Sequence, residues 1–348
     1  MPDDVLRQMT DVARPITDVA VGVVFDAAGR VLVGQRVAGK PYGGWWEFPG
    51  GKFEPGEDAH GALVRELDEE LGISAERSDP WLVREHVYEH AHVRLHFRHV
   101  VEWRGQARGR EGQALVWRDP AAIDVAPLLP AAIAAVRWLA LPRRYWITDA
   151  AGLGSARFLE ALEARLEVLA RDWSDPRRRA MLLLREPALD RAEVAALHAA
   201  MKVRIARAGL ADRLLLLVSS RHADGRQEGE VTRDGLHLTG RDLYRRVAAA
   251  SALDPAARSD RGYLAASCHE PADLLLADRA GADLAVFGPV LPTASHPSAA
   301  GLGWTGLARA IATTPLPVFA LGGVGPEDLD RARRSGAHGI AIQRAAWR

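Results

Sequence analysis

The chain has 348 residues, longer than a typical single domain, and this length predicts two domains of ordinary size. Lysine plus arginine and aspartate plus glutamate balance at 45 each with the signs interspersed, which excludes a broad basic surface, so no stable nucleic-acid binding is expected. The one cysteine, Cys268, excludes an intrachain disulfide framework and a cysteine-rich zinc site, and it favours a reducing compartment.

The N-terminal segment, residues 1–16, is expected to be neither a secretion signal nor a membrane anchor. Residues 1–18 carry four aspartates and no apolar stretch of signal-peptide length. The longest apolar runs farther along, such as residues 214–218, have the length of strands. We therefore expect a cytoplasmic protein with no membrane span.

The first domain is predicted to mix strands with a few helices. Residues 17–27 and 30–35 are β-branched, alternating runs separated by an Ala-Gly turn, a pattern that predicts a hairpin. After a glycine-rich loop, residues 58–72 predict a helix that Asp58 caps and Gly72 ends. Two further predicted strands, residues 81–89 and 92–103, and a helix from Pro130 to about Leu141 complete this α+β unit.

The second domain is predicted to be a barrel of alternating strands and helices. Eight short apolar runs recur over about 200 residues, as a (β/α)₈ barrel requires, and near-continuous apolar strands are typical of a parallel sheet buried on both faces. The runs are YWITD, AMLLLRE, RLLLLVSS, GLHLTG, GYLAAS, DLAVFGPV, LPVFALGGV and HGIAIQ. The expected organisation is a first domain at 17–141, a linker at 142–144 and a TIM barrel at 145–348.

The strongest motif lies on the helix at 58–72 and in the loop before it. The pattern is G-x5-E-x7-R-E-U-x-E-E-x-G-U, where U is a bulky apolar residue, and it is filled by Gly51, Glu57, Arg65, Glu66, Leu67, Glu69, Glu70, Gly72 and Ile73. At 100° per residue, Glu66, Glu69 and Glu70 fall within an arc of about 100° beside the apolar stripe of Leu63, Leu67 and Leu71.

Three carboxylates on one helix edge need neutralisation. Two of them about 4 Å apart repel by about 4 kcal/mol at an effective dielectric near 20. Partial protonation is one answer, and a hard divalent cation such as Mg²⁺ or Mn²⁺ is another. In isolation the helix could also be an ordinary solvated acidic face, but the glycine-rich loop at fixed distance favours the metal.

On these residues the chain resembles the Nudix superfamily, and residues 17 to about 141 are similar to its MutT branch. The resemblance implies that Glu66, Glu69 and Glu70 bind metal and that Gly50 and Gly51 shape the loop beside them, with Gly50 contributing to the metal site. It also implies that Glu57 and Arg65 form an ion pair holding the loop to the helix.

Three residues outside the motif also match the MutT branch. Glu111, in the segment Gly109–Gln113, stands where the branch has a glutamate that activates the attacking water, which makes it a candidate base or fourth metal ligand; the alternative is an ordinary surface glutamate. Arg36 matches an arginine that grips substrate phosphate, and Phe48 matches a residue at the base pocket. The implied reaction is attack of metal-activated water at phosphorus, which releases nucleoside monophosphate and pyrophosphate from a triphosphate.

The preferred nucleobase rests on one position. MutT-like enzymes that remove 8-oxo-dGTP, and so protect DNA replication, carry Pro-Pro-Ala-Asn before the last helix, whereas this chain has Leu129-Pro130-Ala131-Ala132. An alanine side chain cannot hydrogen-bond the base edge. We expect 8-oxo-dGTP as the substrate, and the alternative is a thiamine-related pyrophosphate.

From residue 145 onward the sequence is similar to thiamine phosphate synthases and TenI-type thiazole tautomerases, both of which are (β/α)₈ barrels. The matching segments are Leu184–Glu186, Asp234–Leu238 with Asp242, Ser267 and His269, Gly288-Pro289, Pro292-Thr293 and Gly322–Val324. The resemblance implies a phosphate site built from Arg185, Ser267, His269, Thr293, Gly322 and Gly323, at the strand ends where barrel sites form. His269 could act as an acid or base, or serve only as a hydrogen-bonding group.

Several synthase residues are replaced in this barrel. Ser219-Ser220 stands where the synthases have Asn-Asp, and Pro187 and the region of His296 stand where they have lysines, while Arg344 replaces a serine. These replacements remove a metal ligand and two pyrophosphate contacts. We expect a degenerate or TenI-like binder of a thiamine-pathway phosphate rather than an active synthase, and it could regulate or localise the hydrolase.

A cluster of histidines at 86, 90, 92, 96 and 99 raises the alternative of a zinc site. The histidines alternate with apolar residues, which is typical of a half-exposed strand pair. Without a nearby cysteine or acidic ligand at metal spacing, we favour the strand pair.

Overall fold

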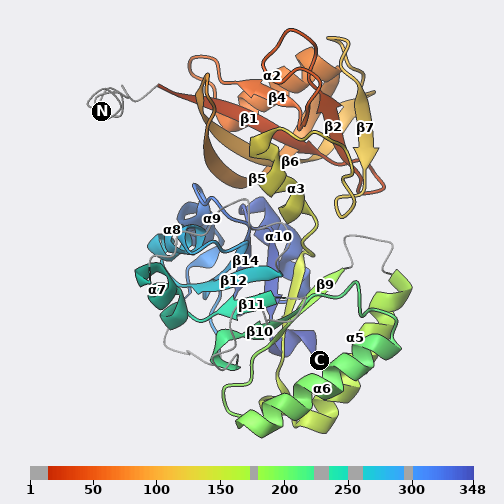
Figure 1. Ribbon diagram of the computed structural model, residues 1–348, viewed down its shortest axis with the longest axis vertical. Helices are drawn as coiled ribbons and strands as arrows, with labels where there is room; N and C mark the ends of the chain where they lie inside the picture. The colour runs from red at the N-terminus through yellow and green to blue at the C-terminus, as the bar shows by residue number, and fades with distance from the viewer. Residues whose placement is uncertain (1–14, 173–178, 223–234, 250–261, 294–300) are drawn as a thin grey trace, which may run out of the picture. The chain divides into compact units, whose positions relative to one another are not determined.

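The computed structural model describes residues 15–172, 179–222, 235–249, 262–293 and 301–348. It forms two compact units (Figure 1). Of the described residues, the first unit contains 15–78, 83–118 and 124–133, and the second contains 79–82, 119–123 and those from 134 onward. Among the described residues, none of the helices is both long and apolar enough to cross a membrane.

The first unit contains a four-stranded and a three-stranded sheet. The larger sheet has the strand order β4-β1-β6-β5 and the smaller has the order β3-β2-β7. The strands are β1 (Ile16–Val24), β2 (Val31–Gln35), β3 (Trp46–Glu47), β4 (Gly50–Lys52), β5 (Ile73–Val87), β6 (His92–Gly105) and β7 (Leu115–Arg118). The helix α2 (Ala59–Leu71) belongs to the first unit, and α3 (Pro130–Leu139) begins there, with its residues from Ala134 onward counted in the second unit.

The predicted hairpin of residues 17–27 and 30–35 is wrong. β1 and β2 lie in different sheets and meet only at an isolated bridge between Phe25 and Val31. β1 pairs instead in parallel with β6 along its whole length, from Ile16 opposite His92 to Val24 opposite Val100. The alternating pattern predicts a strand but carries no information about which distant strand supplies the hydrogen bonds.

The predicted helix at 58–72 is confirmed as α2. The Asp58 carboxylate accepts hydrogen bonds from the backbone N–H groups of His60 and Gly61, and Gly72 ends the helix with φ +69°. Leu63, Leu67 and Leu71 are buried in one cluster with Ala20, Val24, Leu32, Ile73 and Val100. This packing fixes the helix against β1 and so fixes which edge of the helix faces away from the core.

The second unit is the expected barrel, closed by eight parallel strands in the order β10-β11-β12-β13-β14-β15-β8-β9. All eight predicted strands are present. They are β8 (Arg144–Ile147), β9 (Ala180–Leu184), β10 (Leu216–Ser219), β11 (Gly235–Leu238), β12 (Tyr263–Cys268), β13 (Leu284–Phe287), β14 (Val318–Leu321) and β15 (Gly339–Ile342).

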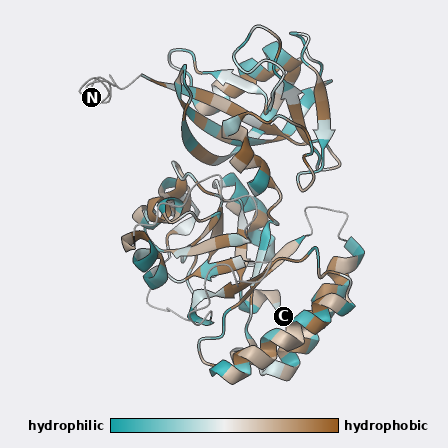
Figure 2. Cartoon of the chain, in the orientation of Figure 1, coloured by the Kyte–Doolittle hydropathy of each residue, from teal (hydrophilic) through white to brown (hydrophobic). Residues whose placement is uncertain are grey.

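Helical segments follow the barrel strands. They are α4 (Ala150–Leu153), α5 (Ser155–Asp172), α6 (Arg191–Arg207), η1 (Ser220–His222), α7 (Gly240–Ala248), α8 (Pro271–Arg279), α9 (Gly303–Ile311), η3 (Pro326–Asp328), α10 (Leu329–Arg334) and η4 (Arg344–Ala346). Figure 2 shows hydrophobic and hydrophilic residues mixed along α5 and α6. On α5 the buried residues Phe158, Leu162 and Leu166 recur every four positions, so one side of this helix packs on the barrel.

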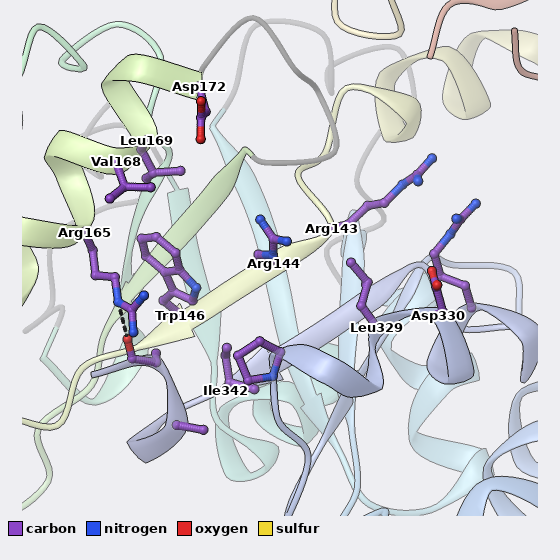
Figure 3. A pocket seen from close by; sticks show the side chains of 14 residues that line it. Arg143, Arg144, Trp146, Arg165, Val168, Leu169, Asp172, Leu329, Asp330 and Ile342 are labelled. Carbon is purple, nitrogen blue, oxygen red and sulfur yellow. Dashed lines mark hydrogen bonds between the residues drawn. The ribbon is translucent and has the colours of Figure 1, made fainter. Parts of the chain in front are cut away.

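A pocket of about 620 Å³ lies on the outside of the barrel (Figure 3). Its floor includes Arg144 and Trp146 from β8 and Ile342 from β15, and residues of α5 and α10 form its walls. Arg165 of α5 donates from Nε to the carbonyl oxygen of Ala346, at 2.9 Å. None of the residues that the sequence assigns to a site lines this pocket.

The cysteine lies deep in the barrel. Cys268 ends β12 and is fully buried. Burial raises the pKa of its thiol to about 12, because the thiolate cannot be solvated there.

Candidate active site

A pocket of about 450 Å³ in the first unit collects most of the residues that the sequence assigns to chemistry. Its acidic lining residues are Glu47, Glu66, Glu70 and Glu111, and its basic ones are Arg36, Lys40 and Lys52. Gly50 and Gly51 also line it. Glu69, Glu57, Arg65 and Phe48 do not.

Two glycines let the loop before α2 approach its neighbours. Gly50 has φ +144°, and a β-carbon there would clash with the carbonyl oxygen of Ala20 on β1. A β-carbon on Gly51 would occupy the place of the Glu66 carboxyl group. The motif therefore needs glycine at both positions so that β4 can pair with β1 while Glu66 lies against the loop.

Arg65 joins this loop to α2. Its Nε and Nη2 donate to the two carboxylate oxygens of Glu57 at 2.9 and 2.8 Å, and Nη2 also donates to the carbonyl oxygen of Lys52 at 2.9 Å. Its Nη1 donates to Glu66 at 2.9 Å and to Glu69 at 3.3 Å. These contacts raise the pKa of Arg65, and the hydrogen bonds from Arg65 lower that of Glu57 to about 2.

Glu70 is the most perturbed carboxyl group of the pocket. Its pKa rises to about 7, first because burial disfavours the charged form and then because Glu66, Glu111 and Glu47 add negative charge nearby. Near neutral pH the Glu70 carboxyl group is therefore partly protonated. Burial and the neighbouring carboxylates thus both oppose ionisation of Glu70, and a bound cation would favour it.

The clustered carboxylates of Glu66, Glu70 and Glu111 form an all-oxygen donor set that suits a divalent cation. In the described part of the chain, however, no three carboxylate, histidine or cysteine side chains already converge as metal ligands. Arg65 instead hydrogen-bonds both Glu66 and Glu69. Glu69 is 61% exposed and does not line the pocket, so it can turn without disturbing the core.

The loop that carries Glu111 is attached to the C-terminal end of α2. Gln113 donates from Nε2 to the carbonyl oxygen of Glu70 at 3.1 Å, and the backbone N–H of Arg110 donates to the same oxygen at 2.9 Å. The Gln113 side chain also accepts from the N–H of Glu111 at 2.8 Å. Gln113 therefore brings Glu111 to the same pocket as Glu70, although about 40 residues separate them.

Two predicted substrate-binding residues have partners within the protein. Arg36 donates from Nη1 to both carboxylate oxygens of Glu47, at 2.6 and 2.7 Å, and from Nε to the carbonyl oxygen of Pro41 at 2.8 Å. Phe48 is buried, with its ring 6.4 Å from that of Phe97. Arg36 thus lies in the pocket, whereas Phe48 belongs to the core behind it.

An aromatic wall, which the sequence analysis missed, completes the pocket. It consists of Tyr42, Tyr88 and His90. The rings of Tyr88 and His90 stack with centroids 5.4 Å apart, and that of Tyr42 lies 5.5 Å from Tyr88. Tyr88 and His90 belong to the histidine-rich stretch considered for zinc, and the spacing of aromatic residues there was the only available signal.

In the barrel, the predicted residues lie at or after the carboxyl ends of strands. Ser267 on β12 hydrogen-bonds Nε2 of His237 at 2.8 Å, and the hydroxyl of Tyr145 lies 2.9 Å from Nδ1 of the same ring. Burial lowers the pKa of His237 to about 3, so this imidazole is neutral. His237 lies in a segment that matches the synthases, although the sequence does not assign it to the site.

The other predicted barrel residues lie after different strands. His269 donates from Nδ1 to the carbonyl oxygen of Gly288 at 3.1 Å, while Arg185 is exposed after β9. Gly322 and Gly323 follow β14 with φ +97° and +69°, and Thr293 is half-buried. Asp234 and His296, which the resemblance also singled out, lie outside the described residues.

Glu186, in the matching segment after β9, makes a contact with the backbone. The Glu186 carboxylate is buried and accepts hydrogen bonds from the N–H groups of Ala150 and Ala151, at 2.7 and 3.0 Å. It therefore caps the start of α4. Both of its oxygens therefore have a structural role.

The fold and both sets of residues define a two-domain protein with a Nudix hydrolase unit and a thiamine-synthase-type barrel. Residues 20–137 match the family model for the NUDIX domain, and residues 144–346 match that for thiamine monophosphate synthase. The chain belongs to the thiamine monophosphate synthase family through its barrel and to the Nudix family through its first domain. It is a hydrolase acting on phosphorus anhydrides.

Curated relatives agree with each half. A CTP pyrophosphohydrolase of Escherichia coli is 41% identical over 119 residues, which is 32% of this chain and 84% of that protein. An 8-oxo-dGTP diphosphatase of Haemophilus influenzae is 36% identical over 112 residues, 32% of this chain and 82% of that protein. A thiamine-phosphate synthase of Salinibacter ruber is 39% identical over 110 residues, 31% of this chain but only 46% of that protein.

Proposed function

We propose that the first unit hydrolyses a nucleoside triphosphate to the monophosphate and pyrophosphate, with 8-oxo-dGTP as the preferred substrate and Mg²⁺ or Mn²⁺ as the cofactor. The observation that carries this proposal is the concentration of Glu66, Glu70 and Glu111 in one pocket, where the pKa of Glu70 rises to about 7. These three carboxylates would repel a polyphosphate beside them unless a cation neutralises them. Four of the similar proteins are named 8-oxo-dGTP diphosphatases, which supports the substrate class.

The residues that would hold the metal are Glu66, Glu70 and Glu111 from within the pocket, the exposed Glu69 beside Arg65 and the backbone of Gly50 in the loop. When bound, the metal supplies charge neutralisation and acidifies a water molecule. The ion pair of Arg65 with Glu57 keeps the loop in place when Glu66 and Glu69 leave Arg65 for the metal.

The other steps fall to the chain's own side chains. Glu111 is 44% exposed and lines the pocket, so its carboxylate can accept the proton of the attacking water. Arg36 lines the pocket while paired with Glu47, so its guanidinium adds positive charge beside the phosphates without leaving that partner. The aromatic wall of Tyr42, Tyr88 and His90 offers ring faces to a base.

CTP is a second candidate substrate. Ala132 is buried at the start of α3 and its side chain cannot hydrogen-bond a purine edge. The Escherichia coli relative that is 41% identical is named a CTP pyrophosphohydrolase. A third candidate, a thiamine-type diphosphate, would place both units in one pathway.

For the barrel, we infer a binding role towards a thiamine-pathway phosphate, with contacts from Arg185, Ser267, His269, Thr293 and the backbone of Gly322 and Gly323. The support is the family match together with the strand-end position of these residues. A nucleotide-sanitising enzyme acts on the cytoplasmic nucleotide pool, so we also place the protein in the cytoplasm.

A turnover screen of the full-length protein tests these proposals. 8-oxo-dGTP, dGTP, CTP and thiamine diphosphate are compared with and without Mg²⁺, with pyrophosphate and phosphate release as the readout. We expect metal-dependent pyrophosphate release, fastest with 8-oxo-dGTP, and loss of it in both Glu69→Gln and Glu70→Gln with the circular dichroism spectrum unchanged. Faster turnover of CTP or thiamine diphosphate would reject the 8-oxo-dGTP assignment, and full activity of both variants would reject the metal site.

A further inference from the structure

Lys40 lies in the candidate active site, although the sequence analysis did not assign it. It lines the pocket of Glu66, Glu70 and Glu111, and its Nζ lies 2.7 Å from a carboxylate oxygen of Glu111. An ammonium group is thus held within hydrogen-bonding distance of the candidate base, inside the pocket that would receive the phosphates.

The ion pair between Lys40 and Glu111 is poorly suited to a structural role. The side chains are 47% and 44% exposed, and such pairs contribute little to folding stability because water already solvates both charges. Lys40 also follows Gly39, which has φ +89°, so it sits in a turn and not in a regular element. A weak pair on a turn can exchange its partner at low cost.

The neighbouring cation is already engaged. Nη1 of Arg36 contacts both oxygens of Glu47, and burial raises the pKa of Glu47 despite this pairing. Releasing Arg36 fully would leave the Glu47 carboxylate buried without its partner, which is unfavourable. Releasing Lys40 leaves Glu111 half exposed, where water can replace the ammonium group.

From these contacts we propose that Lys40 binds the diphosphate moiety of the substrate, and that Glu111 holds the Lys40 ammonium group in the pocket until substrate arrives. The exchange also frees the Glu111 carboxylate at the moment when substrate is in place. Lys40 is thus a substrate-binding residue whose resting partner is the candidate base. This inference rests on the proposed function in that the substrate carries a phosphorus anhydride.

A binding experiment tests Lys40 without requiring turnover. Inorganic pyrophosphate with Mg²⁺ is titrated into the full-length protein by calorimetry, and Lys40→Met and Lys40→Arg are compared with wild type. Lys202→Met, at an exposed position on α6 of the barrel, is the matched control for loss of one lysine charge. We expect the Kd of Lys40→Met to rise about tenfold, as for loss of one charge-assisted hydrogen bond, with substantial rescue in Lys40→Arg and no change in Lys202→Met.

Kinetics with the best substrate of the screen supply the second readout. Lys40→Met should raise KM about as much as Kd, with kcat changing less than threefold or so, because the lost contact is to bound phosphate. An unchanged Kd for pyrophosphate overturns the proposal. A fall in kcat at constant KM also overturns it, because Lys40 would then act only by placing Glu111. Failure of 8-oxo-dGTP hydrolysis in wild type would reject the substrate proposal alone, since pyrophosphate binding still reports on Lys40.

Discussion

The carboxyl group of Glu66 occupies the space that a side chain at Gly51 would need. The glycine is on β4 and the glutamate is about two turns into α2, so the loop and the helix fit together only while position 51 has no β-carbon. This contact explains why the motif fixes a glycine so far along the chain from its glutamates.

Gly51→Ala should therefore displace the Glu66 carboxylate from the pocket. Because a shift of about 1 Å at a reacting group can cost about a hundredfold in rate, we expect kcat/KM to fall roughly a hundredfold. Gly61→Ala is the matched control, since a β-carbon there meets only the Asp58 carboxylate at an ordinary 3.5 Å. Equal activity of the two variants would show that the position of Glu66 does not matter.

Ala132→Asn should increase the preference for 8-oxo-dGTP over dGTP. A side-chain amide that reads a base edge contributes about 1–3 kcal/mol to discrimination, so we expect a change of about tenfold or more in the ratio of kcat/KM values. Ala131→Asn places the same amide one residue earlier on α3 and should leave the ratio near that of wild type. A ratio that shifts equally in both variants would disconnect position 132 from base selection.

The barrel should lose stability when the pH falls below about 6.5. Burial lowers the pKa of both His237 and His338 to about 3, whereas an unfolded histidine titrates near 6.5. Between these values only the unfolded chain takes up the protons, so each histidine lowers the free energy of unfolding by about 1.4 kcal/mol per pH unit as the pH decreases. Above pH 6.5 both histidines are neutral in the folded and in the unfolded chain, so they no longer make the free energy of unfolding depend on pH.

The measurement is urea unfolding of the full-length protein at intervals between pH 5 and pH 8, with tryptophan fluorescence as the signal. The two histidines contribute equally to the dependence of the free energy of unfolding on pH below 6.5. His338→Gln should therefore remove about half of this contribution. A free energy of unfolding that stays constant from pH 8 to pH 5 would contradict the neutral, buried state of these rings.

Leu67→Ala should destabilise the first unit. Leu67 is fully buried between α2 and the sheet, and truncating such a side chain costs about 2–5 kcal/mol. Ile133→Ala removes a side chain that is 56% exposed and should change stability by about 0.5 kcal/mol or less. Differential scanning calorimetry should show a lowered unfolding temperature for Leu67→Ala and an unchanged one for Ile133→Ala.

The parts of the fold that follow from local chemistry could be predicted. Asp58 and Gly72 set the ends of α2 because capping acts within one turn, and Leu63 with Leu67 identifies its buried face. The barrel strands were equally clear, since a strand buried on both faces must be apolar nearly throughout. β5 was harder, because polar residues such as Ser78 and Asp79 hide its first half.

Contacts between distant segments could not be derived from the sequence. Nothing near Lys40 indicates that Glu111 will lie beside it, and nothing near Glu47 indicates that it will bind Arg36. The resemblance named Arg36 and Glu111 but not their partners. These partners depend on how β2, β3 and the loop before β7 meet, which sequence periodicity does not encode.

The burial of Cys268 makes its thiol a probe of local unfolding in the barrel. With a pKa of about 12, only about one thiol in 10⁵ is ionised at pH 7, and the sulfur is fully covered. A thiol reagent can therefore react only in the rare moments when β12 separates from its neighbours, and the first unit has no thiol to compete. The labelling rate of Cys268 would then report how often the barrel opens locally. A phosphate compound that binds the barrel and stabilises it should slow this labelling.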